Sequence, residues 1–168
     1  MAIRAIRVMG EDDVLRKHAR KVDKFDARLH ELLTDMAETM RAGEGVGLAA
    51  PQVGVLKRAV VIDVSAIREE GDEVLELVNP EIVSTEGENT VIEGCLSVPG
   101  RAGRVVRPEK VTVKAQDRDG NAIEVTGEGM LAVCLCHELD HLDGILYVDK
   151  MIEDATEEMK RRRGGGEA

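Results

Sequence analysis

The segment from Met130 to Leu142, MLAVCLCHELDHL, constrains the fold more than any other part of the chain. It opens on a strongly apolar run, and it is flanked by Gly127 and Gly144, which suit the start and the end of a helix. A helix that is apolar on most of its surface is buried in the interior of a protein. We therefore expect a central helix over residues 127–144, and two histidines in such a helix need a reason to be there.

One other long helix is predicted near the N-terminus. It begins after Asp26, a suitable N-cap, and ends at Gly43. Apolar side chains recur along it with helical spacing, which indicates a face packed into the core. These side chains are Leu29, Leu32, Leu33, Met36 and Met40.

The remaining patterns predict strands. Residues 59–64 form a buried strand, a second strand ends at Asn79-Pro80, and residues 90–100 form a strand that runs into a tight loop. Residues 111–117 and 122–126 flank an Asp-Gly pair and form the strongest hairpin signal in the chain.

Together these elements predict an α+β fold in a single domain over residues 1–168. A mostly antiparallel sheet packs around the central helix that carries HExxH, with an N-terminal helix and a short C-terminal helix beside it. The basic run from Lys160 to Arg163 stands next to three glycines, so residues 160–168 are expected to form a flexible, solvated tail. The alternative is a tail that docks electrostatically on a partner.

Composition excludes several classes of function. Phe25 and Tyr147 are the only aromatic residues, and the formal net charge is −10, so a surface that reads nucleic acid by base stacking is not expected. The cysteine number is odd, at three, which argues against a disulfide framework and for reduced thiols in a cytoplasmic protein. No apolar run approaches the length of a membrane span, so no membrane partner is expected.

The histidines of the central helix indicate a metal site. At about 100° per residue, His137 and His141 project from one face of a helix, and Glu138 lies about 60° from His141. Imidazoles at this spacing bind one metal ion, and a carboxylate beside them can act on a metal-bound water. We therefore predict a metal site on this helix.

Spacing alone leaves the third ligand open. A zinc protease would need a ligand after His141, and Glu153 or Asp154 could serve. A thiolate is the better candidate, because one cysteine and two histidines leave the fourth tetrahedral position for water, as in catalytic sites.

Three cysteines compete for this role. Helix geometry turns Cys136 away, at about 100° from His137 and about 140° from His141. Cys134 lies about 60° from His137 and about 20° from His141, so it is on the correct face but two turns from His141. Cys95 lies in a separate Gly-Cys-Leu-Ser turn, where backbone amides can point at a ligand.

Three motifs in order resemble the peptide deformylase family. They are GVGLAAPQVG at 45–54, EGCLSVPG at 93–100 and HELDH at 137–141. The resemblance runs nearly from end to end. It implies that Cys95, His137 and His141 bind one divalent metal, iron(II) first, with zinc, nickel or cobalt as alternatives.

The resemblance also implies a reaction. Members of the family remove the N-formyl group from the initiator methionine of nascent polypeptides and release formate. Glu138 would be the general acid and base, while the Gln52 side-chain amide and the Leu96 backbone N–H would donate to the developing oxyanion. The segments that match the family's substrate-binding residues are Val46, Gly47, Val91, Gly94, Met130, Val133 and Cys134. The resemblance thus makes Cys134 a pocket wall instead of a ligand.

Glycines at 43, 45 and 47 let the loop backbone come close to the substrate without obstruction by a Cβ atom. They also serve as a helix stop and a turn, and both roles can hold.

Two positions depart from the family pattern. Cys136 stands immediately before HExxH where relatives often have Gln, and we expect it to affect packing beside the metal site. Ala102 stands where relatives have an Arg three residues after the Pro, so Arg101 or Arg104 is expected to contact the downstream peptide instead. The basic tail suggests contact with the ribosome, as a C-terminal helix makes in some relatives.

Two other functions are weighed against deformylation. One is an HExxH metallopeptidase that cuts internal peptide bonds, which requires a ligand after His141. The other is an inactive metal-binding interaction module, which would be favoured if Gln52 or Glu138 were missing. Both residues are present.

Overall fold

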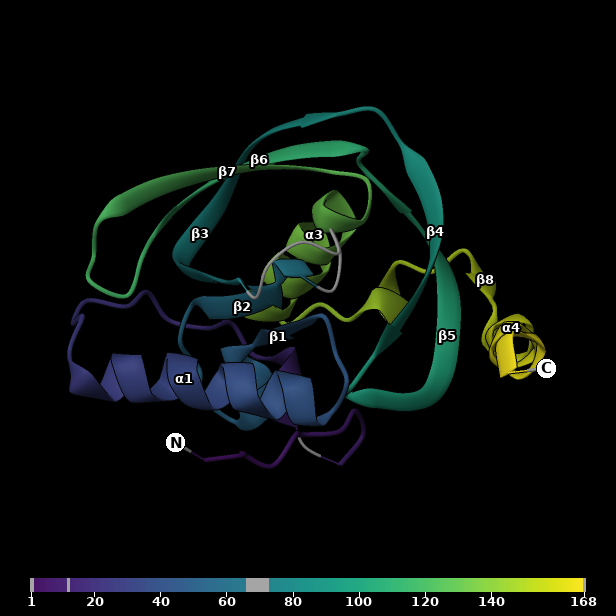
Figure 1. The fold of residues 1–168 in the computed structure, drawn as a ribbon, viewed down its shortest axis with the longest axis horizontal. Helices are drawn as coiled ribbons and strands as arrows, with labels where there is room; N and C mark the ends of the chain where they lie inside the picture. The colour runs from purple at the N-terminus through teal and green to yellow at the C-terminus, as the bar shows by residue number, and fades with distance from the viewer. Residues whose placement is uncertain (1, 12, 66–72, 168) are drawn as a thin grey trace.

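The computed structural model describes residues 2–11, 13–65 and 73–167, with the backbone alone from residue 163 (Figure 1). The helical elements are η1 (Asp13–Arg16), α1 (Ala27–Ala42), η2 (Ala50–Val53), α3 (Met130–Leu142), η3 (Tyr147–Asp149) and α4 (Thr156–Glu167), where η marks a 3₁₀ helix. The strands are β1 (Gly47–Ala49), β2 (Ala59–Asp63), β3 (Val74–Glu86), β4 (Asn89–Cys95), β5 (Val98–Arg107), β6 (Lys110–Gln116), β7 (Ala122–Glu128) and β8 (Glu153–Asp154).

Two antiparallel sheets surround one central helix. The larger sheet has the strand order β1-β2-β3-β6-β7, and the smaller has the order β4-β5-β8. Figure 1 shows α3 inside the arch that these strands form, with α1 on the outside near β1 and β2, and α4 beside β5 and β8. The predicted α+β class, with a mostly antiparallel sheet around the HExxH helix, is confirmed.

The central helix α3 is buried along almost its whole length. Only Met130 and Asp140 of its 13 residues are not buried. The predicted start near Gly127 is wrong by one turn, because β7 continues to Glu128. Gly129 then turns the chain with φ of +59°, a backbone conformation that suits glycine, and the helix begins at Met130.

The N-terminal helix α1 agrees with its prediction. The Asp26 side chain accepts a hydrogen bond from the Leu29 N–H, and Gly43 caps the other end. The predicted apolar face packs against β2 and neighbouring segments, so its role in the core is confirmed.

Strand β3 is longer than the sequence predicted. The prediction ended it at Asn79-Pro80, whereas it runs to Glu86. The pairing of β3 with β6 shifts register between Val78 and Glu81, and proline is tolerated in strands at such irregularities. Asn79 has φ of +51°, and its side chain bonds the backbone of Val22 and the side chain of Gln116.

Strand β5 was missed altogether. Residues 100–107 carry glycine and arginine, which are poor strand formers, and the sequence offers no alternation of apolar residues in their first half. Pairing with β4 and β8 nevertheless forms the strand. This hairpin of β4 and β5 carries one wall of the functional site.

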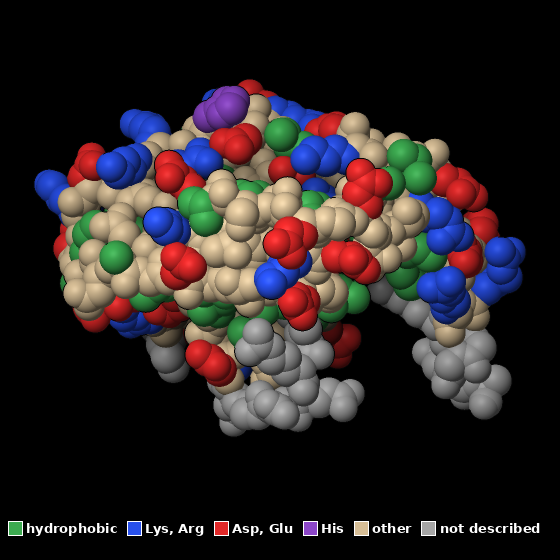
Figure 2. Space-filling model, turned by 90° about the horizontal axis from the view of Figure 1, so that it is seen from above, with side chains coloured by type: hydrophobic (Ala, Val, Ile, Leu, Met, Phe, Trp, Pro, Cys, Tyr) green, Lys and Arg blue, Asp and Glu red, His purple; other side chains and the backbone are tan. Residues whose placement is uncertain are grey.

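The C-terminal residues form a helix as far as Glu167. The prediction of a flexible tail over 160–168 stays a prediction. Within the described ranges, no helix is both long and apolar enough to cross a bilayer. On the face in Figure 2, acidic and basic side chains are interspersed over much of the surface.

Candidate metal centre and active-site cleft

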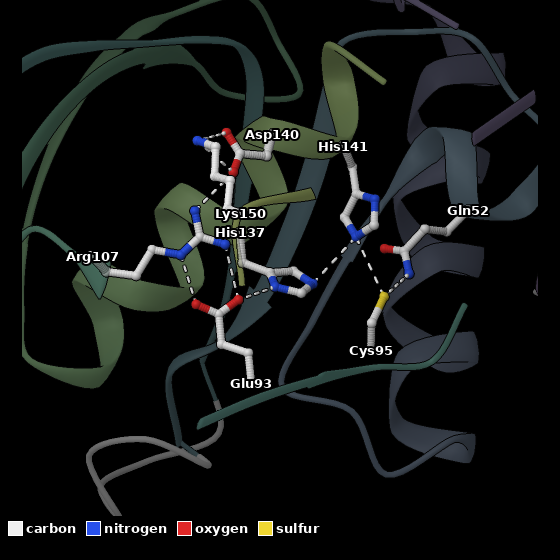
Figure 3. A network of polar contacts seen from close by, with 8 residues as sticks. All are labelled: Gln52, Glu93, Cys95, Arg107, His137, Asp140, His141 and Lys150. Atoms are coloured by element: carbon white, nitrogen blue, oxygen red, sulfur yellow. Dashed lines mark hydrogen bonds and ion pairs between the residues drawn. The ribbon is translucent and has the colours of Figure 1, made fainter. Parts of the chain in front are cut away.

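Three predicted ligands meet at one point between β4 and α3. Cys95 lies at the end of β4, while His137 and His141 project from α3 (Figure 3). Their ligand atoms all lie within 4.8 Å of one another. The two histidine Nε2 atoms are 3.3 Å apart, and the Cys95 Sγ is 3.5 Å from the Nε2 of His141.

These separations fit a tetrahedral ion. Metal bonds of ~2.1 Å to nitrogen and ~2.3 Å to sulfur place two nitrogens about 3.4 Å apart, and a nitrogen about 3.6 Å from a sulfur. The His137–His141 distance of 3.3 Å and the Cys95–His141 distance of 3.5 Å are close to these values. Two imidazoles and one thiolate also form a donor set that zinc, iron and their neighbours accept.

The other metal candidates lie elsewhere. Glu153 and Asp154 are exposed in β8, where their carboxylates pair with Arg104 and Arg101. Cys134 lines the cleft, but burial and the nearby Glu138 raise the pKa of its thiol to about 12, which keeps it protonated. Cys136 is buried, and it does not line the cleft.

A buried carboxylate orients His137. The Oε1 atom of Glu93 lies 2.6 Å from the Nδ1 atom of His137, so Nδ1–H donates to the carboxylate and Nε2 faces His141. Partners of this kind fix the tautomer and the ring orientation of a metal-binding histidine. Burial raises the pKa of Glu93, but hydrogen bonds from Arg107 and His137 outweigh burial and lower it to about 2.

Arg107 holds this carboxylate in place. Its Nε and Nη2 atoms donate to both oxygens of Glu93, at 2.6 and 2.9 Å. Its Nη1 atom donates to Asp140, which also accepts from Lys150 (Figure 3). Arg107 and Glu93 are 2% and 5% exposed, so this ion pair is buried.

Glu138 lies beside the ligands and lines the cleft. Burial raises its pKa to about 7. Its Oε1 atom is buried and has no hydrogen-bond partner among the described residues. A Cβ added to Gly47 would lie 2.6 Å from the Oε2 atom of Glu138, so only glycine at this position leaves room for the carboxylate.

Gln52 faces the same point from η2. Its Oε1 atom accepts from the Ala49 N–H at 2.9 Å, which fixes the orientation of the amide. Its Nε2 atom therefore points toward the Oγ atom of Ser97 at 3.1 Å and the Sγ atom of Cys95 at 3.5 Å. Leu96 also lines the cleft, and its side chain packs against Gly43 and Gly45.

A cleft of about 780 Å³ opens at these residues. Every residue predicted for substrate binding lines it: Val46, Gly47, Val91, Gly94, Met130, Val133 and Cys134. Val46 and Met130 are exposed at 38% and 54%, so apolar surface at the mouth of the cleft is open to a ligand.

Sequence reasoning missed Glu93, Arg107 and Asp140. A signal for Glu93 was present, because residues two apart on a strand share a face and Glu93 precedes Cys95 by two positions. Arg107 could not be found in the same way, because it stands at the end of the strand that the sequence did not reveal.

A buried H-E-x-x-H helix, a thiolate in reach of both imidazoles and a carboxylate at the cleft define a metal-assisted hydrolase. The family profile described as Polypeptide deformylase matches residues 3–157. The chain belongs to the polypeptide deformylase family, whose members are metal-dependent hydrolases, and the predicted resemblance and enzyme class are confirmed.

Individual relatives agree with this assignment. Peptide deformylase of Acetivibrio thermocellus is 60% identical over 97% of this chain and 92% of its own length. That of Caldicellulosiruptor bescii is 56% identical, over 99% of this chain and 97% of its own. A crystal structure of a peptide deformylase from Legionella pneumophila superposes with a TM-score of 0.84 at 52% identity, covering 95% of this chain and 92% of that one. A peptide deformylase from Synechococcus elongatus, in complex with actinonin, gives 0.82 at 41% identity, over 87% and 79%.

Proposed function

We propose that this chain removes the formyl group from the N-terminal formyl-methionine of nascent polypeptides, with the residues of the cleft in the following roles. Cys95, His137 and His141 hold one divalent metal ion, and Glu138 moves the proton. The observation that carries the proposal is the meeting of the Cys95, His137 and His141 ligand atoms within 4.8 Å of one another, beside a cleft that Cys95, His137 and Glu138 line.

When bound, a divalent ion at this site supplies Lewis-acid activation of water and of the formyl oxygen. Glu138 accepts a proton from the attacking water and returns it to the leaving amine. A pKa of about 7 suits both transfers, because a general acid–base group works best near the operating pH. The buried Oε1 atom without a protein partner is the atom available to the water.

The oxygen of the formyl group gains negative charge as its carbon becomes tetrahedral. The Gln52 amide, held by Ala49, and the Leu96 backbone N–H donate to that oxygen. A donor placed in advance for such an oxyanion is worth ~2.7–4 kcal/mol of barrier.

The apolar part of the cleft holds the methionine side chain. Val91, Val133 and Cys134 line it, together with the exposed Val46 and Met130 at the mouth. A chain of methylenes and a thioether loses its hydration there, which favours methionine over polar side chains.

Iron(II) is the metal that we propose, with zinc, nickel and cobalt able to occupy the same donor set. Metal analysis of protein purified without oxygen identifies the resident ion. We expect about one divalent ion per chain and loss of activity on chelation. Full activity after complete chelation would contradict metal dependence.

We place the chain in the cytoplasm, because its three cysteines are free thiols and nascent formylated chains are made there. The exposed cations Lys160, Arg161 and Arg162 of α4 are candidates for contact with the ribosome. Cosedimentation with ribosomes at low and high salt tests this contact. Equal recovery of wild type and a variant with all three changed to Gln would contradict it.

The decisive assay is formate release from a formyl-methionyl peptide by protein prepared without oxygen. Replacement Glu138→Ala is expected to lower kcat at least ~100-fold with the metal content unchanged. Glu124→Gln, on the exposed face of β7, is the matched control and is expected to retain activity. Wild-type activity in the Glu138→Ala variant would remove the assigned role of Glu138.

A further inference from the structure

The cleft extends beyond the metal ligands and the apolar pocket. Its outer wall comes from the start of β5, from Val98 to Ala102, and from three residues of α4. Those three are Thr156, Met159 and Lys160. A substrate held by its first residue in the apolar pocket therefore has room for its next residues against β5 and α4.

Helix α4 is fixed in this position by contacts with β5. The Ala155 N–H donates to the Ala102 carbonyl at 2.9 Å, and the Ala102 N–H donates to the Thr156 hydroxyl at 3.2 Å. Arg104 adds ion pairs to Glu153 and Glu158. The residues of α4 that line the cleft thus belong to a defined wall.

Two cations line this wall, and among the described residues their ion pairs are long. The Arg101 guanidinium pairs with Asp154 at 3.8 Å, and the Lys160 ammonium pairs with Glu157 at 3.9 Å. Their side chains are 43% and 62% exposed. Both ion pairs are long and exposed, so both cations can exchange them for a carboxylate of a ligand.

The other charged residues of the cleft do not cancel these cations. Glu93 is committed to Arg107 and His137, and Glu138 lies at the reacting end. Glu44, on the loop after α1, is the remaining exposed anion among the described lining residues. The part of the cleft formed by β5 and α4 is therefore cationic in a chain whose net charge is −10. In Figure 2, Lys and Arg side chains gather at the end of the molecule where α4 lies.

Arg101, and not the neighbouring Ala102, is exposed at this wall of the cleft. Ala102 is buried at 3%, under the backbone contacts that anchor α4, so a longer side chain has no room there. Arg101, the residue before it, is exposed and lines the cleft. Arg104 is engaged with Glu153 and Glu158 and does not line the cleft, so Arg101 is the arginine of β5 that lines it.

We propose that Arg101 and Lys160 form a cationic subsite that favours substrates with an acidic side chain within the two residues after the methionine. This inference rests on the proposed deformylase function. The subsite acts on binding of the downstream peptide, so its effect falls on KM and leaves kcat nearly the same. Because both cations are solvent-exposed, the effect is modest and weakens as salt screens the charges.

The test compares formyl-Met-Asp-Ala-Ser and formyl-Met-Ala-Asp-Ser with the peptides that carry Asn in place of Asp. In at least one pair, kcat/KM for the Asp peptide is expected to be about threefold to tenfold higher at low salt, through KM. The ratio is expected to approach one above about 0.5 M salt. Replacements Arg101→Gln and Lys160→Gln each lower the ratio, and the double variant brings it to about one.

Arg162→Gln is the matched control, because it removes an exposed cation from α4 that does not line the cleft. This variant is expected to keep the wild-type ratio. A ratio of one for wild-type protein in both pairs overturns the subsite, while formate release from the Asn peptides still supports deformylation. An equal loss of preference in Arg162→Gln would show that any cation of α4 attracts acidic peptides through long-range electrostatics. That result would also overturn the subsite. Failure to release formate from any of the four peptides would count against the proposed function itself.

Discussion

Two arginines of β5, three residues apart, make the same kind of contact in opposite surroundings. Arg107 is 2% exposed and binds Glu93 and Asp140. Arg104 is 27% exposed and binds Glu153 and Glu158. Glu93, the partner of Arg107, binds the metal-site residue His137. Glu158, a partner of Arg104, lies in α4, so this ion pair connects α4 to β5.

The difference shows how burial decides what an ion pair does. A buried pair contributes little net attraction after the cost of desolvation, but removal of one partner leaves an uncompensated charge in the core. An exposed pair is screened by water and salt, and removal of one partner changes little. The buried network therefore acts as a rigid support for the ligands, whereas the more exposed pairs of Arg104 can be removed at a small cost in stability.

The largest expected effect tests the buried side of this comparison. Replacement Arg107→Met leaves the buried Glu93 carboxylate without its arginine, and we expect the free energy of unfolding to fall by ~3–5 kcal/mol. Urea denaturation of metal-free protein measures it. The matched replacement Arg104→Met on the same strand is expected to cost less than ~1 kcal/mol. Equal losses in the two variants would refute the contrast.

The next effect concerns the metal. Replacement Glu93→Gln removes the charged acceptor of the His137 Nδ1–H, and we expect metal affinity to fall about 10–100-fold. Competition with a chelator of known affinity gives the dissociation constant. Glu153→Gln, which changes a carboxylate of the exposed pair, serves as control and is expected to leave the affinity unchanged. Unaltered affinity in Glu93→Gln would mean that the network does not support the ligand.

A third pair joins a partly exposed arginine to a buried carboxylate. Arg4 is 32% exposed and binds Asp35, whose side chain is 3% exposed and also accepts from the Ala2 N–H. Burial raises the pKa of Asp35, but the hydrogen bonds from Ala2 and Arg4 outweigh burial and lower it below its ordinary value.

A lowered pKa in the folded state stabilises the protein above the ordinary carboxyl pKa of about 3.9, and this stability is lost as the pH falls through the folded value. We therefore expect Asp35→Asn to cost ~1–2 kcal/mol at pH 7 and to become nearly neutral in strong acid. Unfolding free energies of both proteins from pH 7 downward measure it. A cost that stays constant with pH would show that the charge is not responsible.

The smallest expected effect concerns the ion pairs of Arg104 with Glu153 and Glu158. Replacement Arg104→Gln is expected to leave global stability within ~1 kcal/mol but to speed amide hydrogen exchange in α4, because the helix loses its ion pairs to β5. High salt is expected to produce a similar change in wild-type protein. Unchanged exchange in α4 would mean that the backbone contacts of Ala102 hold the helix alone.

The sequence predicted the elements whose patterns are local. The buried helix α3, the capped helix α1 and the Asp-Gly hairpin of β6 and β7 carry their own signals in spacing, caps and turns. The extension of β3 past Pro80 and the whole of β5 carry no such signal, because partner strands determine them. Tertiary pairing outweighed local preference in both cases.

The site divides in the same way. Two histidines and Glu138 follow from helix geometry within one segment, and the family resemblance supplied Cys95 and Gln52 from two others. Arg107 and its contacts depend on a strand that the sequence did not reveal. The positioning of Glu138 against Gly47 also needed the structure, because it depends on the approach of β1 to α3.

The measurement that most directly tests the assembly of the site is the metal content of two cysteine variants prepared side by side without oxygen. The account predicts that Cys95→Ala loses the ion, while Cys134→Ala retains about one ion per chain because its buried thiol only lines the cleft. Loss of the ion in Cys134→Ala, with retention in Cys95→Ala, would contradict a site built from β4 and α3.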